Sequence, residues 1–173
     1  MYKRVLVTLD RSAASEAILP QVERMAGRDQ PEVFLLTVAE VPEGTAEAPH
    51  PLVIGGAAAP GGVVKVPPPR TAEDKGQALQ RTKQELSDYL KEKAAALKEK
   101  GLRVETEVRF GDPAKEILAA AKTREVDLIM MATHGRTALA QVIFGSVAAR
   151  VLGSGVRPVL LVRPEKLREG DAS

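Results

Sequence analysis

The chain has 173 residues and a mass of 18.5 kDa, which is the length of one domain and enough to bury a sizeable apolar core. Its 44% hydrophobic and 28% charged residues are typical of a globular protein and exclude a collagen-like, globally disordered or membrane-bundle chain. Lys and Arg number 25 against 23 Asp and Glu, and aromatic residues make up only 3%, so neither a basic nucleic-acid surface nor a base-stacking platform is expected.

Cysteine is absent and histidine occurs twice, which excludes disulfides, thiol chemistry, Cys-ligated metals and a multi-histidine site. No apolar stretch approaches the roughly 18 residues of a membrane span. The apolar run after Arg4 is also too short for a signal-peptide core. We therefore expect a cytoplasmic protein that binds neither membranes nor nucleic acid.

Five short segments are predicted to be β-strands. Four are nearly continuous apolar runs, as expected of strands covered on both faces, and they span residues 5–9, 33–38, 126–131 and 156–162. The fifth, residues 102–110, alternates apolar and charged side chains, which predicts a strand with one wet face at a sheet edge.

Helical patterns lie between these strands. Ser12 is expected to cap a helix whose apolar positions, as far as Met25, share one face. Pro20 lies inside that pattern and should kink the helix, because proline has no N–H to donate. A long amphipathic helix is predicted over residues 71–100, closed by Gly101.

Two further helices complete the alternation. Asp112 and Pro113 have the residue types of an N-cap and a first helical position, and the last helix is expected to run from about Gly145-Ser146 to Gly153. Strands and helices that alternate in this way predict an α/β fold, a three-layer sandwich around a five-stranded, mostly parallel sheet.

Residues 42–70 do not fit this alternation. The segment holds seven prolines and two Gly-Gly pairs, so it is expected to be neither helix nor central strand. We interpret it as a long loop inserted in a single domain of residues 1–165, followed by a short polar tail, 166–173. A loop of this length is either a functional lid or a disordered linker, and both alternatives stay open.

Ligands of open α/β sheets bind beyond the carboxyl ends of the strands. Asp10 follows the first strand and Ala132-Thr133-His134-Gly135 follows the fourth. After nine intervening residues, Gly145-Ser146 starts a helix. Two stretches of backbone with few side chains are thus predicted to face one crevice, where a helix N-terminus offers unpaired N–H groups to phosphate. A plain turn and a plain helix cap are the alternatives. The Walker phosphate loop, the GxGxxG fingerprint and the GxSxG nucleophile elbow are absent.

Four segments resemble those of a known family: VLVTLDRSAASEAIL, VFLLTVAE, FGDPAKEIL and DLIMMATHGRTALAQVIFGSVAARVLGSGVRPVLLV. With coverage from about Lys3 to Arg163, outside the Pro/Gly loop, the chain resembles the universal stress protein family. The signature of that family's ATP-binding branch is G-x2-G-x9-G-[ST]. Here Gly135, the spacing and the Gly145-Ser146 pair match it, while Ala132 replaces the first glycine.

The resemblance implies a Rossmann-like, adenine nucleotide alpha hydrolase-like sheet of order 3-2-1-4-5. It also implies bound ATP, with any Mg2+ held by phosphate oxygens and water rather than by the protein. The binding residues that it implies are Thr8, Leu9, Asp10 and Val38 at adenine and ribose, Ala132 at the ribose, and His134, Gly135, Gly145, Ser146 and Val147 around the phosphates. No residue is assigned as catalytic.

The resemblance further implies a homodimer paired through the last strand, Pro158 to Val162, whose uncovered edge would otherwise invite aggregation. A tail folded over that edge is the alternative. Three functions stay open: an ATP-binding stress-response or signalling module whose protein-partner binding depends on nucleotide, a slow ATP hydrolase or nucleotidyl transferase, and a nucleotide-free interaction protein. Ala132 supports the last, and the lack of an obvious base besides His134 argues against a primary role as an enzyme.

Overall fold

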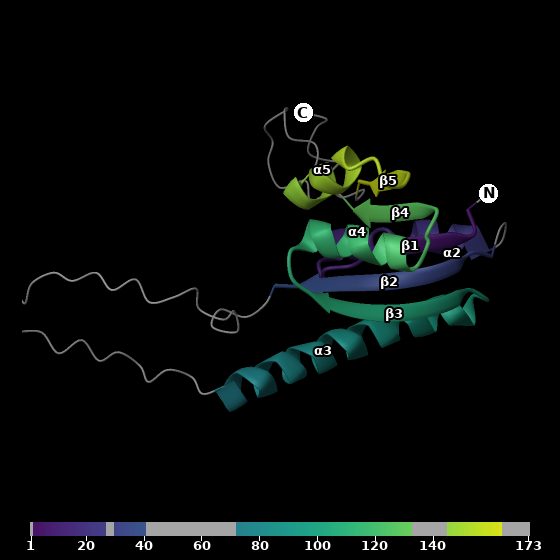
Figure 1. Ribbon diagram of the computed structural model, residues 1–173. Coiled ribbons are helices and arrows are strands. Elements are labelled where there is room, and N and C mark those ends of the chain that lie inside the picture. The colour runs from purple at the N-terminus through teal and green to yellow at the C-terminus, as the bar shows by residue number, and fades with distance from the viewer. Residues whose placement is uncertain (1, 27–29, 41–71, 133–144, 164–173) are drawn as a thin grey trace, which may run out of the picture.

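The computed structural model describes residues 2–26, 30–40, 72–132 and 145–163. In it, all five strands pair in parallel in one sheet of order β3-β2-β1-β4-β5 (Figure 1). The strands are β1 (Arg4–Thr8), β2 (Glu32–Ala39), β3 (Arg103–Phe110), β4 (Leu128–Ala132) and β5 (Val159–Val162). The predicted fold class and strand order are confirmed.

Helices cover both faces of the sheet and make the three predicted layers (Figure 1). The helices are α1 (Ala13–Glu16), α2 (Leu19–Ala26), α3 (Ala72–Glu99), α4 (Pro113–Thr123) and α5 (Ser146–Gly153). One core cluster joins α2 and α3 to one face, for example through Val22 and Leu90, which are both fully buried. A second cluster joins α4 and α5 to the opposite face through residues such as Ile117 and Val151.

The predicted helix from Ser12 to Met25 is interrupted rather than kinked. Ser12 caps α1 as expected, because its side chain accepts the N–H of Ser15. Helix α1 ends at Glu16, Ala17 still has αR angles and donates its N–H to the Ala13 carbonyl, and α2 starts only at Leu19. The reason is Pro20, which lacks an N–H and whose ring would clash with the carbonyl group of Glu16 in a continuous helix.

The other predicted helix ends agree with the structure. Gly101 follows α3 with a φ of +88°, a left-handed conformation that suits glycine. Asp112 caps α4 by accepting the N–H of Lys115 at 2.9 Å, with Pro113 at the first helical position. These signals set the place where α4 begins, at the carboxyl edge of the sheet.

The edge strands also agree with the sequence pattern. The strand order leaves β3 at one edge and β5 at the other. In β3, Val104 is buried while Arg103 and Glu105 are exposed, as the alternation predicts, but residues 106–110 are all half-buried.

The predicted loop, residues 42–70, and the predicted tail, residues 166–173, lie outside the described residues. Among the described helices, none is both long and apolar enough to cross a membrane.

Candidate functional site

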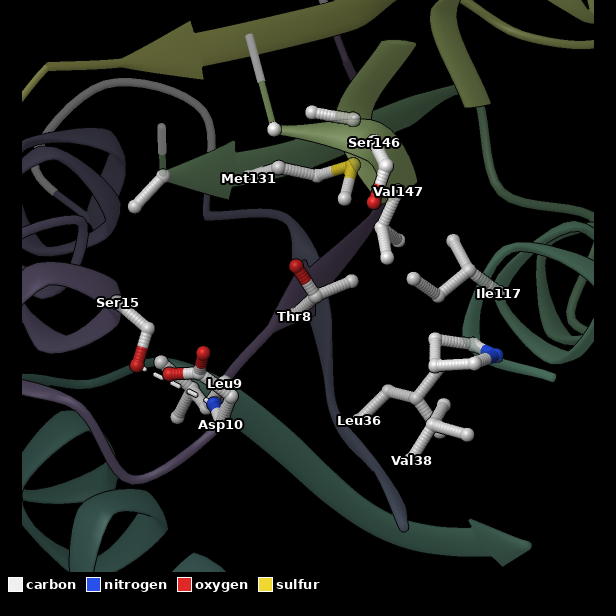
Figure 2. A pocket seen from close by; sticks show the side chains of 14 residues that line it. Thr8, Leu9, Asp10, Ser15, Leu36, Val38, Ile117, Met131, Ser146 and Val147 are labelled. Atoms are coloured by element: carbon white, nitrogen blue, oxygen red, sulfur yellow. Dashed lines mark hydrogen bonds between the residues drawn. The ribbon is translucent and has the colours of Figure 1, made fainter. Parts of the chain in front are cut away.

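A cavity of about 380 Å³ opens at the carboxyl ends of β1, β2 and β4 (Figure 2). The N-termini of α4 and α5 close it from the other side. The chain runs from β1 to β2 and β3 on one side of the sheet, then crosses over to β4 and β5 on the other side of β1. The cavity therefore lies at the topological switch point, where parallel α/β sheets commonly bind ligands.

Eight of the ten predicted binding residues line this one cavity. They come from the end of β1, from β2, from the end of β4 and from the start of α5: Thr8, Leu9, Asp10, Val38, Ala132, Gly145, Ser146 and Val147. The other two, His134 and Gly135, lie outside the described residues. The structure thus brings together segments that are up to about 140 residues apart in the sequence.

Six further residues line the cavity that were not predicted: Ser15, Leu36, Pro113, Ile117, Met131 and Ala148. A periodicity signal was available for two of them. Leu36 stands two residues before Val38 in the same strand and so shares its face, and Ile117 lies one helical turn after Pro113. The sequence does not show where α4 packs on the sheet, so the place of Ile117 in the cavity could not be predicted.

The turn that carries Asp10 is held by hydrogen bonds among Asp10, Ser12 and Ser15. The Ser12 N–H and hydroxyl both donate to Asp10 Oδ1, at 3.0 and 2.6 Å. The Asp10 N–H donates to Ser15 Oγ at 3.2 Å, and the Ser15 hydroxyl donates to the Ser12 carbonyl at 2.9 Å. Because Ser15 is only 3% exposed, this set fixes the carboxylate of Asp10 at the rim of the cavity.

The end of β1 is fixed by β2 in a similar way. The Leu9 N–H donates to the Leu36 carbonyl at 2.9 Å, and the buried Thr37 hydroxyl donates to the Leu9 carbonyl at 2.9 Å. The backbone that leads to Asp10 therefore leaves the sheet in one defined direction.

The start of α5 is open toward the cavity. Gly145 is the N-cap of this helix and makes no side-chain cap hydrogen bond, and the first turn carries no acidic side chain. Its φ of −59° and ψ of 157° suit any residue, and a Cβ added to it would meet no atom within 4 Å. Neither conformation nor packing within the described residues therefore requires glycine at this position.

The walls of the cavity differ in character (Figure 2). Leu36, Val38 and Ile117 lie together on one side, with Asp10 and Ser15 on the opposite side. Among the described residues that line it, Asp10 is the one ionisable side chain. A search of the same described residues finds no group of three metal-ligating side chains. The site thus offers a ligand an apolar wall, one carboxylate and the N-terminus of a helix.

Comparison with known proteins gives one consistent family. A model of the universal stress protein family matches residues 57–163. The universal stress protein MJ0577 of Methanocaldococcus jannaschii is 30% identical over 163 residues, which cover 94% of this chain and 96% of the relative. The universal stress protein YxiE of Bacillus subtilis is 31% identical over 163 residues, with 94% and 100% covered.

Solved structures agree with these sequence matches. That of MJ0577 has a TM-score of 0.71 at 25% identity and covers 94% of this chain and 96% of its own. Two others show the same fold at 18% identity. A universal stress protein in complex with cAMP has a TM-score of 0.61, with 94% and 98% covered. The Archaeoglobus fulgidus universal stress protein in complex with dAMP has a TM-score of 0.53, with 92% and 97% covered.

Proposed function

The chain belongs to the universal stress protein family, and from that premise we propose that it is a module that binds an adenine nucleotide, with ATP as the expected ligand. The observation that carries this proposal is the convergence of residues 8–10, Val38, Ala132 and residues 145–147 on one cavity at the switch point of the sheet. Two solved structures of the same fold are complexes with cAMP and dAMP, which supports an adenine nucleotide as the ligand class.

The phosphates are assigned to the start of α5. The first N–H groups of a helix have no partner within the helix, and the helix dipole favours negative charge there. Within the described part of the chain, the N-cap of α5, Gly145, makes no side-chain cap hydrogen bond and leaves space that a Cβ would fill. Ser146 adds a hydroxyl donor at the same place. Mg2+, when it accompanies ATP, would be held by phosphate oxygens and water.

The base and ribose are assigned to the other end of the cavity. The side of the cavity formed by Leu36, Val38 and Ile117 fits the flat face of a base. The Asp10 carboxylate, a charged hydrogen-bond acceptor held by Ser12, is suited to accept hydrogen bonds from ribose hydroxyls.

Calorimetric titration with ATP, with and without Mg2+, tests the proposal. Gly145→Val should abolish binding by filling the space before α5. The matched control is Gly153→Val at the other end of the same helix, where an added Cβ also meets no atom within 4 Å. Equal affinities of Gly145→Val and the wild type would contradict the assignment. Phosphate release in the same samples tests the slow ATP hydrolase.

Ala132 favours a second candidate, a nucleotide-free interaction protein of the same family. Ala132 ends β4 and pairs with Val162. Its φ is not positive, so its backbone conformation does not need glycine. Its methyl group therefore matters only if a ligand must approach the backbone closely. Ala132→Gly should raise ATP affinity if it does. Failure of both Ala132→Gly and the wild type to bind ATP would favour the nucleotide-free protein.

We also propose a homodimer paired through β5. This edge strand is four residues long, and its Leu160 is 43% exposed on the face of the sheet opposite the one where Val159 and Leu161 pack. Val159 and Leu161 instead pack against the core, so a charge there would also unfold the protein. Leu160→Asp is therefore the cleaner variant. It should convert a dimer to a monomer in light scattering, and an unchanged mass would contradict pairing at this strand.

Finally, we propose that nucleotide occupancy alters the binding of a protein partner in a stress-response or signalling role. A ligand in the cavity would contact the first turns of both α4 and α5, whose outer faces are exposed to partners. Amide hydrogen exchange with and without ATP should then change along both helices. A change confined to the cavity-lining residues would argue against transmission to a partner surface.

A further inference from the structure

The Asp10 turn is held from outside the cavity by α3. The Tyr89 hydroxyl donates to Glu16 Oε1 at 2.9 Å. The Lys93 ammonium lies 3.0 Å from Glu16 Oε2 and 5.4 Å from the centre of the Tyr89 ring. Glu16 is the last residue of α1, the short helix whose cap, Ser12, binds the carboxylate of Asp10. Tyr89, which does not line the cavity, thus contacts α1, the helix whose cap orients Asp10.

Burial and the hydrogen bond to Glu16 raise the pKa of the Tyr89 hydroxyl, so this contact is partly withdrawn from water. The other end of the same segment has an unfavourable backbone conformation. Arg11 directly follows Asp10 and has a φ of 67°. A left-handed conformation costs free energy for a residue that has a Cβ, so it persists only where surrounding contacts stabilise it.

The segment from Arg11 to Glu16 is too short to be stable without contacts to the rest of the protein. With four residues, α1 is one turn long, and a helix of that length is not stable in isolation. One side of it is fixed by the buried Ser15. The other side is fixed by the hydroxyl of Tyr89 and the ammonium of Lys93.

We propose that Tyr89 is a positioning residue of the nucleotide site, which holds the turn of residues 10–12 in place through Glu16. The inference rests on the proposed function for its ligand but names a residue outside the cavity and on a different helix. Its hydroxyl acts through Asp10 and does not touch the ligand.

Tyr89→Phe is the first variant to test. It keeps the ring, which packs against the core, and removes the hydroxyl. Since one hydrogen bond of this kind contributes modestly, ATP affinity by calorimetry should fall about two- to tenfold. The control is Lys91→Met on the same helix, where the ammonium pairs with Asp88, and it should leave the affinity unchanged.

A double-mutant cycle separates positioning from general loosening. If Tyr89 acts through Asp10, Tyr89→Phe should cause no further loss of ATP affinity in an Asp10→Ala background. Equal losses in both backgrounds would overturn the proposal.

Amide hydrogen exchange of the ligand-free protein gives a readout that needs no nucleotide. Tyr89→Phe should speed exchange in residues 10–16 and leave β1 and α5 unchanged, whereas unchanged exchange in residues 10–16 would overturn the proposal. A wild type that fails to bind ATP would refute the proposed function alone, because the exchange experiment still tests Tyr89.

Discussion

The guanidinium of Arg150 on α5 donates to the carboxylate of Asp112 at 2.8 Å, and the same carboxylate caps α4 by accepting the Lys115 N–H at 2.9 Å. These two hydrogen bonds hold the pKa of Asp112 below its ordinary value. One side chain thus joins the first turn of α4 to α5. Both helices begin at the cavity, so this contact links two of its walls.

Removing both roles of Asp112 should lower stability more than removing its ion pair with Arg150 alone. Asp112→Ala removes the helix cap and the link to α5, and should lower the melting temperature by roughly 2–4 °C. Arg150→Gln removes only an exposed ion pair and should change it much less. Thermal unfolding followed by circular dichroism measures both. Equal losses in the two variants would mean that the cap contributes little.

A carboxylate at the start of α5 should raise the stability of the protein but abolish its binding of ATP. Ser146 is exposed at the first helical position, and Ser146→Asp should stabilise the helix by about 0.3–1 kcal/mol through its dipole. The same charge would occupy the N–H groups assigned to phosphate and repel it, so ATP binding should be lost. Calorimetry measures the loss of ATP binding, and thermal unfolding of the same sample measures the gain in stability. Ser146→Ala, which adds no charge, is the control, and retention of ATP affinity by Ser146→Asp would contradict the phosphate assignment.

The two halves of α3 should differ in their contribution to stability. Leu90 is fully buried between α3 and the sheet, whereas Leu79 lies in the N-terminal half, which extends past β3, and is only half-buried (Figure 1). Leu90→Ala should therefore lower the free energy of unfolding by about 2–5 kcal/mol. Leu79→Ala, the matched truncation, should cost far less. Urea unfolding gives both values, and similar losses would show that the N-terminal half is also packed.

The fold could be predicted because its signals are local. Apolar runs marked β1, β2 and β4, alternation marked β3, and Asp112-Pro113 marked the start of α4. The sequence indicated that Pro20 disturbs the helix, but it predicted a kink and not a division into α1 and α2. Whether a proline kinks or ends a helix depends on what the next residues can bury, and here Ile18 becomes fully buried between the two helices.

The site could be predicted only where residues lie at strand ends. Asp10 and Ala132 follow from the rule that ligands bind beyond the carboxyl ends of parallel strands, whereas Val38 was implied by the family resemblance. Ile117 and Ser15 could not be found in that way, because their place in the cavity depends on how α4 and α1 pack across the sheet. Tyr89 lies further still from any local signal, since its partner Glu16 is 73 residues away.

Glu107 should make stability depend on pH in the acid range. Burial disfavours the charged carboxylate, but hydrogen bonds from Arg109 at 2.6 Å and Arg124 at 3.0 Å outweigh burial and leave the pKa of Glu107 below its ordinary value of 4.5. A carboxylate with a lowered pKa in the folded state stabilises the protein above its ordinary pKa, and this contribution is lost as the pH falls through the lower, folded value. Arg124 is itself held over the Phe34 ring at 5.2 Å, so the ion pairs have little freedom to rearrange.

Glu107→Gln should therefore be less stable than the wild type at pH 7. The difference should shrink as the pH falls from about 4.5 through the lower pKa of the folded state, where the wild-type carboxyl group becomes neutral as well. Urea unfolding at pH 7, 5, 4 and 3 measures the difference. Glu85→Gln, at an exposed position of α3, should show no such trend and serves as the control. A constant difference between Glu107→Gln and the wild type from pH 7 to pH 3 would mean that Glu107 contributes through packing and hydrogen bonding, and that its charge adds nothing to the stability of the β3 edge.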